Sequence, residues 1–479
     1  MIKGLTGDFP VLKYFAEITD IPRCSKEEEK ISNYLVAWAK ERNLEVIQDE
    51  ENNVIIKKPA TKGYENEPIV ILQGHMDMVC EATKGHEHNF CCDPIEAVVE
   101  GDRIIAKNTT LGADDGIAVA MMLAILDGDY EHPALECLIT TDEETGMTGA
   151  HTLDGKLLEG RTLINIDSEE EGIITVGCAG GLVSNIVFEK SFKAPEKDVF
   201  LQLDFGGFRG GHSGADIDDE RGNPILLLAR MLREVSFEHD FELVDFSGGS
   251  KPNAIPRDAE AIIGVDSKDV DVVKEALNRS ADTILKEFVA TDPNGKLSIV
   301  EAKADKVLTP EVADGIINYL LLAPNGVNTF SKKIEGLVES STNVGVGASD
   351  DEKVVFTMQI RSDVESKIHF IALKNRMAGE VNGGKYEEQS SYAAWEYAEE
   401  SPLRDKAVKL WKEITGEEAT VEMIHAGLEC GILQDAIGHM DMISIGPDME
   451  GVHAPGENLS ISSTKRVFDY LIKLLNTKG

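Results

Sequence analysis

The first third of the chain alternates between helical and strand-like hydrophobic patterns. Residues 8–20 and 26–42 carry apolar side chains at helical spacing, which predicts two amphipathic helices. Residues 116–126 are apolar on every side, which predicts a buried helix. Short apolar runs predict strands at 54–57, 68–73, 135–141 and 162–166. Strands that alternate with helices indicate an α/β domain, with a mixed central sheet flanked by helices.

The start of the second predicted helix carries a capping pattern. Ser25 precedes the helical segment, and Glu28 follows at the spacing of a capping box. In such a box the two side chains accept hydrogen bonds from backbone N–H groups that the first turn leaves without partners. We therefore expect Ser25 and Glu28 to cap this helix.

The pattern changes after about residue 181 and changes back near residue 392. Between these points the strands alternate more clearly between apolar and polar residues, and pairs of glycines appear. After residue 392 the helix and strand patterns of the first segment return, at 403–414, 419–424, 440–445 and 460–476. We predict a catalytic α/β domain built from residues 1–183 and 391–479, interrupted by an inserted α+β lid domain at 184–390.

The predicted insert contains two units of similar order. Each has a turn with Ser and Asn, then a strand and a helix: 250–253, 259–265 and 268–288 in one, and 340–343, 353–361 and 364–378 in the other. We expect an internal duplication, with chance similarity between α+β segments as the alternative.

Length, charge and cysteines narrow the class of protein. A chain of 479 residues is too long for one ordinary core. The net charge of -39 argues against nucleic acid or an anionic membrane as partner, because phosphates would be repelled. There is no signal-peptide core and no apolar run long enough to span a membrane. Seven irregularly spaced Cys residues favour reduced thiols and a cytoplasmic location.

Side chains that can bind metal ions follow several of the predicted strands. Carboxyl ends of parallel strands lie at one edge of a sheet, so residues that follow such strands are expected to converge. A bridging carboxylate, further carboxylate and imidazole ligands and a free carboxylate are what two adjacent divalent cations and an activated water require. The candidates are His75, Asp77, Asp114, Glu143, Glu144, Asp167 and His453.

Longer strings around these residues resemble one protein family. The signature motifs of the zinc exopeptidases related to aminoacylase and carnosinase have counterparts at Gly74–Val79, Gly112–Asp115, Thr141–Gly146 and His453. Members of that family that cleave aminoacyl-histidine dipeptides have further counterparts at 166–172, 177–181, 211–214, 251–257, 426–431 and 453–457. The resemblance covers essentially the full chain and implies a metal-dependent dipeptidase.

The resemblance also implies the metal ligands. Asp114 would bridge two zinc ions, which Mn²⁺ or Co²⁺ could replace. His75 and Asp167 would complete one site, and Glu144 and His453 the other. No position of this ligand pattern departs from the family.

The remaining acids have roles in the implied mechanism. Glu143 would take a proton from the metal-activated water and give it to the leaving amine, while Asp77 supports the His75 imidazole. The resulting hydroxide would attack the scissile carbonyl, and a zinc ion would stabilise the oxyanion. The family also has a cis peptide bond after the bridging Asp, which corresponds here to Asp114–Asp115.

Four more residues would contact a dipeptide. His212 and Asn253 would contact the substrate or the tetrahedral intermediate, Arg361 would bind the terminal carboxylate, and Gly427 would line the site. Taken without the resemblance, His212 is as readily a solvated side chain and Arg361 a salt-bridged edge residue. The first predicted repeat carries His212 and the second carries Arg361. We therefore expect one chain to supply both sets, so that a complete site needs no partner, with a homodimer left open.

Other readings stay open at this stage. Another hydrolase of the family, an aminoacylase or a tripeptidase, fits the same motifs. A non-catalytic metal-binding or peptide-binding relative is a different class, but such a relative would be expected to lack Glu143 or a ligand. His425 lies beside Gly427 and could line the pocket, although a core or surface role is simpler. The spacing within His86–Cys92 fits no closed zinc pattern well.

Overall fold

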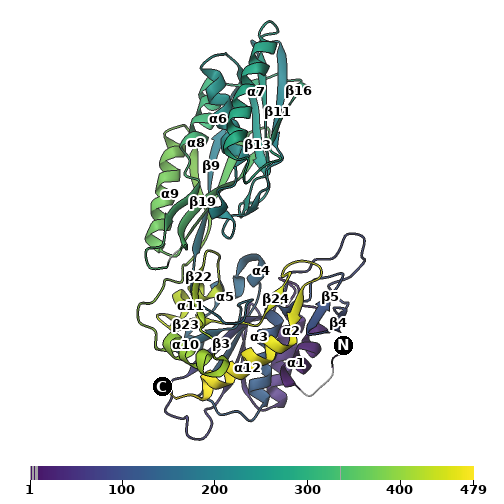
Figure 1. The fold of residues 1–479 in the computed structure, drawn as a ribbon, viewed down its shortest axis with the longest axis vertical. Helices are drawn as coiled ribbons and strands as arrows, with labels where there is room; N and C mark the ends of the chain where they lie inside the picture. The colour runs from purple at the N-terminus through teal and green to yellow at the C-terminus, as the bar shows by residue number, and fades with distance from the viewer. Residues whose placement is uncertain (1, 3–4, 6–8, 335, 479) are drawn as a thin grey trace. The chain divides into compact units, whose positions relative to one another are not determined.

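The helices and strands divide between two compact units, which Figure 1 shows as a ribbon. This computed structural model describes residues 2, 5, 9–334 and 336–478. The first unit contains the chain up to Cys178, Tyr397–Met423 and the chain from Leu428. The second contains Ala179–Glu396 and Ile424–Gly427. The boundaries predicted at 183/184 and 390/391 fall inside strands β9 (Gly180–Glu189) and β21 (Lys385–Tyr392), both of which belong to the second unit.

A mixed sheet organises the first unit. Among the described residues it has eight strands in the order β1-β2-β6-β3-β7-β23-β8-β22. Strands β6, β3, β7 and β23 run parallel to their neighbours in that order, and the β1–β2–β6 edge is antiparallel. These strands are β1 (Glu45–Gln48), β2 (Val54–Lys58), β3 (Val70–His75), β6 (Leu135–Thr140), β7 (Thr162–Asn165), β8 (Ile173–Cys178), β22 (Thr420–Ile424) and β23 (Asp441–Ser444).

Helices and a small second sheet complete this unit. A four-stranded sheet has the order β24-β25-β5-β4. Strand β23, from the last part of the chain, lies between β7 and β8, so the two separated segments of this unit form one sheet. The predicted α/β class with a mixed sheet is confirmed. The remaining elements are α1 (Pro10–Thr19), α2 (Glu29–Glu41), β4 (Ala97–Glu100), β5 (Arg103–Ala106), α3 (Ala113–Asp127), α4 (Glu143–Gly146), α5 (Thr148–Thr152), α10 (Pro402–Thr415), α11 (Glu429–Ile437), β24 (Met449–Glu450), β25 (Asn458–Ser460) and α12 (Ile461–Asn476).

Helix α3 confirms the prediction from its apolar sequence. Residues Ala113–Leu126 are all buried, and the helix packs against α1 and β3. It begins directly after Gly112, whose φ of 69° lies in the left-handed region that favours glycine. The turn at Gly112 therefore connects a buried loop directly to the buried helix α3, and Asp114 lies in the first turn of that helix.

The predicted capping box of α2 is wrong. The helix begins at Glu29 with Glu28 as its N-cap, and no side chain caps it. Ser25 Oγ instead donates to Asp77 Oδ2 over 2.7 Å. Glu28 Oε1 accepts from the backbone N–H groups of Lys26 and Asp142. The Ser25 and Glu28 side chains therefore form hydrogen bonds with Asp77 and Asp142, which are distant in sequence, instead of capping the helix.

The second unit is a long antiparallel sheet with helices packed against it. In the described part of the chain its main sheet has nine strands, in the order β16-β11-β15-β13-β19-β20-β9-β21 with β18 paired to β19. Helices α6 to α9 lie together along this sheet (Figure 1). Its further elements are β10 (Phe192–Lys193), β11 (Val199–Gly206), β12 (Gly211–His212), α6 (Pro224–Ser236), β13 (Glu242–Gly249), β14 (Ala254–Ile255), β15 (Asp258–Val265), α7 (Val270–Glu287), β16 (Lys296–Ala302), β17 (Val307–Leu308), α8 (Pro310–Leu322), β18 (Gly326–Phe330), β19 (Val338–Ser349), β20 (Lys353–Ser362) and α9 (Glu365–Glu380).

The main sheet of this unit has two halves that meet at β13 and β19. These two strands pair only at their ends, Gly248 with Gly347 and Gly249 with Val346. Counted from that junction, β15 and β20 are each the second strand of their half. Each is followed in the chain by a long helix, α7 or α9. The core beneath the helices includes Phe205, Phe246 and Phe356.

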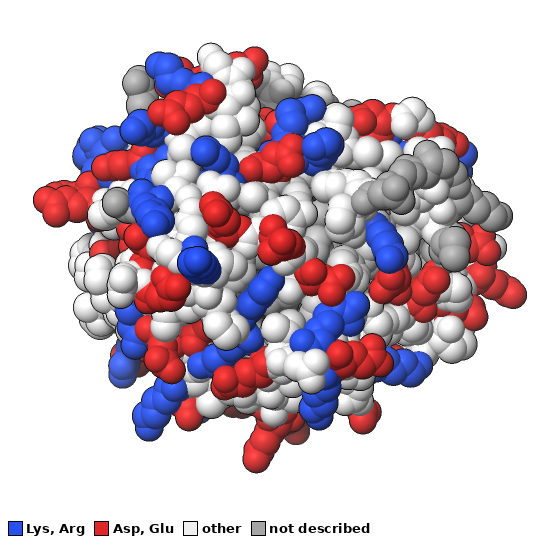
Figure 2. Space-filling model, turned by 90° about the horizontal axis from the view of Figure 1, so that it is seen from below, with Lys and Arg blue, Asp and Glu red and all other residues white. Residues whose placement is uncertain are grey.

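The surface carries both kinds of charge. Figure 2 shows a face on which basic and acidic side chains are interspersed. Many are paired, for example Arg466 with Glu171 at 2.6 Å. Within the described residues, each helix is too short or too polar to cross a bilayer.

Candidate metal centre

Three neighbouring strands bring the predicted acids and imidazole to one edge of the sheet. His75 is the last residue of β3, which lies between β6 and β7 and runs parallel to both. Glu143 and Glu144 open the short helix α4 after β6, and Asp167 follows β7. The carboxyl ends of these strands thus meet, as the sequence predicted.

Asp114 lies between the two histidines. Its Oδ1 is 3.1 Å from His75 Nε2, and its Oδ2 is 3.0 Å from His453 Nε2. His75 Nε2 is also 3.5 Å from Asp167 Oδ1, and His453 Nε2 is 2.9 Å from Glu144 Oε2. Two three-residue clusters therefore share Asp114, and each has the spacing of a metal-ion site. The peptide bond that follows Asp114 is cis, as expected.

The carboxylates of this cluster favour positive charge at their centre, which the pKa values of the neighbouring side chains reflect. Burial opposes a charged His75 imidazole, yet Asp167 and Asp114 raise the pKa of His75 well above its usual value. Hydrogen bonds to Asp114 and Glu144 raise the pKa of His453 to about 11. Burial raises the pKa of Asp167 to about 8. Divalent cations bound here would supply the positive charge that these carboxylates otherwise gain from protonated side chains.

The donor set fits divalent cations. Carboxylate oxygens and imidazole nitrogens are the ligands of zinc, manganese and cobalt, and a shared carboxylate suits a pair of ions. Glu144 Oε1 is buried and has no hydrogen-bond partner among the described residues. His75, Glu143 and Glu144 form a further group with metal-site spacing. A buried acceptor without a donor is costly unless a cation or proton meets it.

Asp77 links the histidine to the glutamate pair. Its Oδ1 lies 3.2 Å from His75 Nδ1 and accepts from the Glu143 backbone N–H over 3.1 Å. Its Oδ2 accepts from the Glu144 N–H over 3.3 Å. Asp77 therefore fixes the start of α4 as well as the imidazole. Burial, with nearby carboxylates, raises the pKa of Glu143 well above its usual value.

Two supporting residues were missed by the sequence analysis. Arg23 is 2% exposed and donates from Nη1 to the Met76 and Asp77 carbonyls, each over 3.0 Å, and from Nη2 to the Gly112 carbonyl. Glu457 accepts from the backbone N–H groups of Leu111, Gly112, Ala113 and Asp114. Glu457 belongs to the His453–Glu457 string and could have been singled out there, whereas nothing local marks Arg23.

A disulfide corrects the expectation of reduced thiols. Cys24 and Cys80 are bonded, with Cα atoms 5.8 Å apart. The Met78 N–H donates to the Arg23 carbonyl, so the two segments run side by side next to Asp77. Cysteine spacing alone does not reveal which chain segments become neighbours. The five other cysteines lie outside any disulfide.

The second unit holds the four predicted substrate residues. His212 and Asn253 lie close together, because β12 pairs with β14 and the Ser213 N–H donates to the Asn253 carbonyl. The backbone N–H groups of Gly214 and Ala215 donate to His212 Nδ1, so Nε2 carries the proton of the neutral ring. Gly427 lies in the segment Ile424–Gly427.

Arg361 is a buried side chain with only part of its hydrogen-bonding capacity used. It is 6% exposed, donates from Nη1 to the Tyr392 hydroxyl over 2.7 Å, and has no partner for Nε among the described residues. Burial and the Arg361 charge lower the pKa of His212. His212 of the separate β12–β14 pair and Arg361 of the main sheet therefore lie within one unit, where the charge of Arg361 affects His212.

His425 also belongs to this group. Its Nε2 lies 2.6 Å from the Ser341 hydroxyl, and burial with the charges of Arg361 and His212 lowers its pKa to about 3. His425 is therefore neutral near physiological pH. Ser341 pairs with Arg361 across β19 and β20, so the three side chains share one region of the sheet.

Comparison with known proteins identifies the family. Residues 71–477 match the description Peptidase family M20/M25/M40. The chain belongs to this family. It is 38% identical over 470 residues to the cytosol non-specific dipeptidase of Escherichia coli (strain K12), covering 97% of each chain.

Solved structures agree with this assignment. The aminoacylhistidine dipeptidase of Vibrio alginolyticus matches with a TM-score of 0.88 and 36% identity, over 98% of this chain and 96% of that one. The aminopeptidase PepT of Bacillus cereus matches with a TM-score of 0.56 at 14% identity, over 98% and 97% of the two chains, which is a likeness of fold alone. The predicted relationship to the aminoacylhistidine dipeptidases is confirmed.

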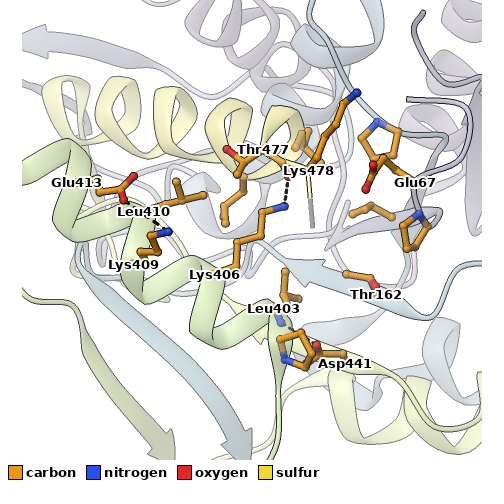
Figure 3. A pocket seen from close by; sticks show the side chains of 16 residues that line it. Glu67, Thr162, Leu403, Lys406, Lys409, Leu410, Glu413, Asp441, Thr477 and Lys478 are labelled. Carbon is orange, nitrogen blue, oxygen red and sulfur yellow. Dashed lines mark hydrogen bonds and ion pairs between the residues drawn. The ribbon is translucent and has the colours of Figure 1, made fainter. Parts of the chain in front are cut away.

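Two other features of this M20-family chain lie apart from the cluster. No group of residues with metal-site spacing is found in His86–Cys92, a fully described segment. A cavity of about 450 Å³ in the first unit is lined by Val70, Thr162 and Asp441, the first residues of β3, β7 and β23 (Figure 3). It therefore lies at the opposite ends of the strands that carry His75 and Asp167, and its Lys406 donates to the Thr477 carbonyl.

Proposed function

We propose that this M20-family protein is a cytoplasmic metal-dependent dipeptidase that hydrolyses Xaa-His and other small dipeptides. The position of Asp114 between His75 and His453 carries the proposal, because one carboxylate facing two ligand clusters suits a pair of cations. The printed names of the Escherichia coli and Vibrio alginolyticus relatives support dipeptides as the substrate class, and the first supports the location.

The ligand roles follow the clusters. Asp114 would be shared by two divalent cations, which we propose to be zinc; His75 and Asp167 would hold one of them, and Glu144 and His453 the other. Mn²⁺ or Co²⁺ can replace zinc, because oxygen and imidazole ligands accept all three. Bound divalent cations supply Lewis-acid activation of water and of the scissile carbonyl.

Glu143 acts as the general base. Its carboxylate accepts a proton from the attacking water and later delivers that proton to the leaving amine. Burial raises its pKa, which suits a group that must both accept and give a proton near neutral pH. Asp77 acts through two neighbours, since it holds the His75 imidazole and the Glu143 backbone.

The second unit supplies the substrate-binding residues. The buried Arg361 guanidinium, with Nε unpaired, binds the C-terminal carboxylate of the dipeptide. His212, through Nε2, and Asn253 contact the substrate, and Gly427 lines its path. The two-half order of the main sheet supports an internal duplication, in which the first repeat carries His212 and Asn253, on or beside the separate β12–β14 pair, and the second carries Arg361, on β20. One chain thereby provides both, and a homodimer is not required.

The test is hydrolysis by the metal-loaded protein. We expect β-alanyl-histidine and glycyl-histidine to be cleaved faster than an N-acetyl amino acid or a tripeptide. The Glu143→Ala variant is expected to retain two metal ions per chain but to lose about 10²–10⁴-fold in kcat. Preference for the acetylated or tripeptide substrate would assign another M20 activity, and failure of metal-loaded protein to hydrolyse any of them would leave only a binding role.

A further inference from the structure

Glu429 is a buried carboxylate near the metal centre to which no role has been assigned above. It is the first residue of α11 and its side chain is 0% exposed. Its Oε2 accepts from the Thr140 hydroxyl and from the Gln73 amide, each over 2.6 Å. Both donors are buried strand residues, so Glu429 is held by the sheet itself.

The hydrogen bonds extend across three strands. Gln73 Oε1 accepts from the Asn165 amide over 2.7 Å. Thr140 is the last residue of β6 and pairs with His75 in the register of β3 and β6. Gln73 precedes His75 on β3, and Asn165 ends β7 just before Asp167. The Glu429 network therefore lies directly behind the strand ends that carry the proposed ligands.

No described Lys or Arg side chain pairs with this carboxylate, although the charge of the His75 imidazole opposes the rise in its pKa that burial causes. Among the described residues the Oε1 atom of Glu429 is buried without a hydrogen bond. Burial raises its pKa to about 7. Its charge is one of the smaller causes that raise the pKa of Glu143 and of Asp167, after burial. A buried anion is costly unless positive charge lies close by.

We propose that Glu429 is a positioning residue of the metal centre: it holds the ends of β3 and β6 through Gln73 and Thr140, and its negative charge strengthens cation binding at His75 and Asp167. The proposal rests on the proposed function, because it requires cations between the ligands. It also gives a reason for the one carboxylate in a buried network whose other members, Gln73, Thr140 and Asn165, are uncharged.

The Glu429→Gln variant tests the charge of this side chain while keeping its size and shape. The amide oxygen can accept the same two hydrogen bonds, so the variant keeps the network and loses only the charge. We expect zinc affinity to fall by about 10–100-fold, the usual cost of altering a residue behind metal ligands. The measurement is the zinc dissociation constant, obtained by competition with a chromogenic chelator of known affinity.

A second readout detects the charge directly. Cation binding should ionise Glu429 in the wild type, so the wild type should release about one more proton than Glu429→Gln when zinc binds near pH 6. Calorimetry in buffers of different ionisation enthalpy gives this number. A role in folding alone would not change the proton count.

Glu136→Gln is the matched control. Glu136 is a buried carboxylate near the other end of β6, where it pairs with Lys57 at 2.7 Å and accepts from the Glu159 and Gly160 N–H groups. Its substitution is expected to leave zinc affinity unchanged. If Glu429→Gln does not fold, Thr140→Val removes one of the two hydrogen bonds and is expected to weaken zinc binding as well.

The outcomes distinguish this proposal from the one on which it rests. Wild-type protein that binds no pair of zinc ions contradicts the proposed function. Wild-type protein that binds two, with the same affinity and the same proton release in folded Glu429→Gln, overturns the role of Glu429 alone. Weaker zinc binding in Glu429→Gln, with Glu136→Gln unchanged, supports it.

Discussion

The Glu457 carboxylate holds the backbone turn that presents Asp114. Its Oε1 accepts from the N–H groups of Ala113 and Asp114 over 2.8 and 3.4 Å, and its Oε2 accepts from two more N–H groups just before them. Glu457 comes shortly after His453 in the chain, so one late segment supplies a proposed ligand and also the support of the bridging residue.

Glu457→Gln is expected to lower stability and zinc affinity together. The amide has one acceptor oxygen, and its NH₂ group would face backbone donors, leaving buried N–H groups without partners. Each unsatisfied group costs about 1–3 kcal/mol. Urea unfolding of the metal-free variant and zinc competition measure the two effects. A variant with wild-type stability and affinity would show that the turn does not depend on this carboxylate.

Asp77→Asn is expected to weaken both metal binding and turnover. The amide cannot accept from both backbone N–H groups of α4 and also face His75 Nδ1 as an anion. We expect about a 10–100-fold loss of zinc affinity, with kcat lower even at saturating zinc. Asp127→Asn is the control and should keep both values, because the Asp127 carboxylate, at the end of α3, is bonded to Arg42 and Tyr14 instead.

Metal-free protein is expected to lose stability as the pH rises. His453 keeps a proton in the folded state up to about pH 11, whereas its usual pKa is 6.5, so its stabilising contribution is complete below 6.5 and is lost toward 11. Asp167 keeps a proton up to about pH 8, while the unfolded chain releases it near 3.8, so its burial becomes increasingly unfavourable in that range. Both effects have the same sign.

The measurement is Tm between about pH 5 and about pH 9, with chelator or with zinc. Tm of the chelated protein should fall across this range, and zinc should reduce the fall because cations replace the protons. His453→Asn should flatten the curve of the chelated protein above about pH 6.5. A Tm that rises with pH in the chelated wild type would contradict the protonated cluster.

The Cys24–Cys80 disulfide is expected to be present in purified, non-reduced protein. Unfolded protein should then show five reactive thiols, and seven after reduction. The bond joins residues 56 apart in sequence, so its loss should lower the free energy of unfolding by about 4 kcal/mol. Seven thiols before reduction would mean that these cysteines are reduced neighbours, as the sequence had suggested.

Gly74→Ala is expected to destabilise the centre from within the sheet. A Cβ at this position would overlap the Asp115 carboxylate and come within 2.6 Å of Ala118 Cβ, both on the buried helix α3. We expect the free energy of unfolding, measured with urea, to fall by about 1–3 kcal/mol. Gly206→Ala is the control, because the nearest atom to its Cβ is Asp258 Cβ at 3.4 Å, an ordinary contact.

Much of the site could be predicted because strand ends have sequence signals. The apolar runs before His75, Glu143 and Asp167 marked buried strands, and parallel strands place such residues at one edge. The helix at Gly116–Leu126 was recognisable because it is apolar on every side. Resemblance to a family then connected His453 to residues that no local pattern could relate to it.

The parts that were missed or wrong depend on contacts between distant segments. Ser25 and Glu28 have the spacing of a helix cap, but Asp77 and the Asp142 N–H bind them instead. Arg23 looks like an ordinary surface residue in the sequence, and Glu429, although it lies in the string 426–431, carries no sequence signal of its burial. The pairing of Cys24 with Cys80 requires the same knowledge of neighbouring segments, which spacing along the chain does not contain.

The late position of His453 also orders events during synthesis. A nascent chain is made from its N-terminus, and domains fold as their parts emerge. His75, Asp114 and Asp167 all leave the ribosome before the long second unit, whereas His453 and Glu457 follow it. A growing polypeptide that has not yet been extended past the second unit lacks His453, so its Asp114–Glu144–His453 cluster is still incomplete.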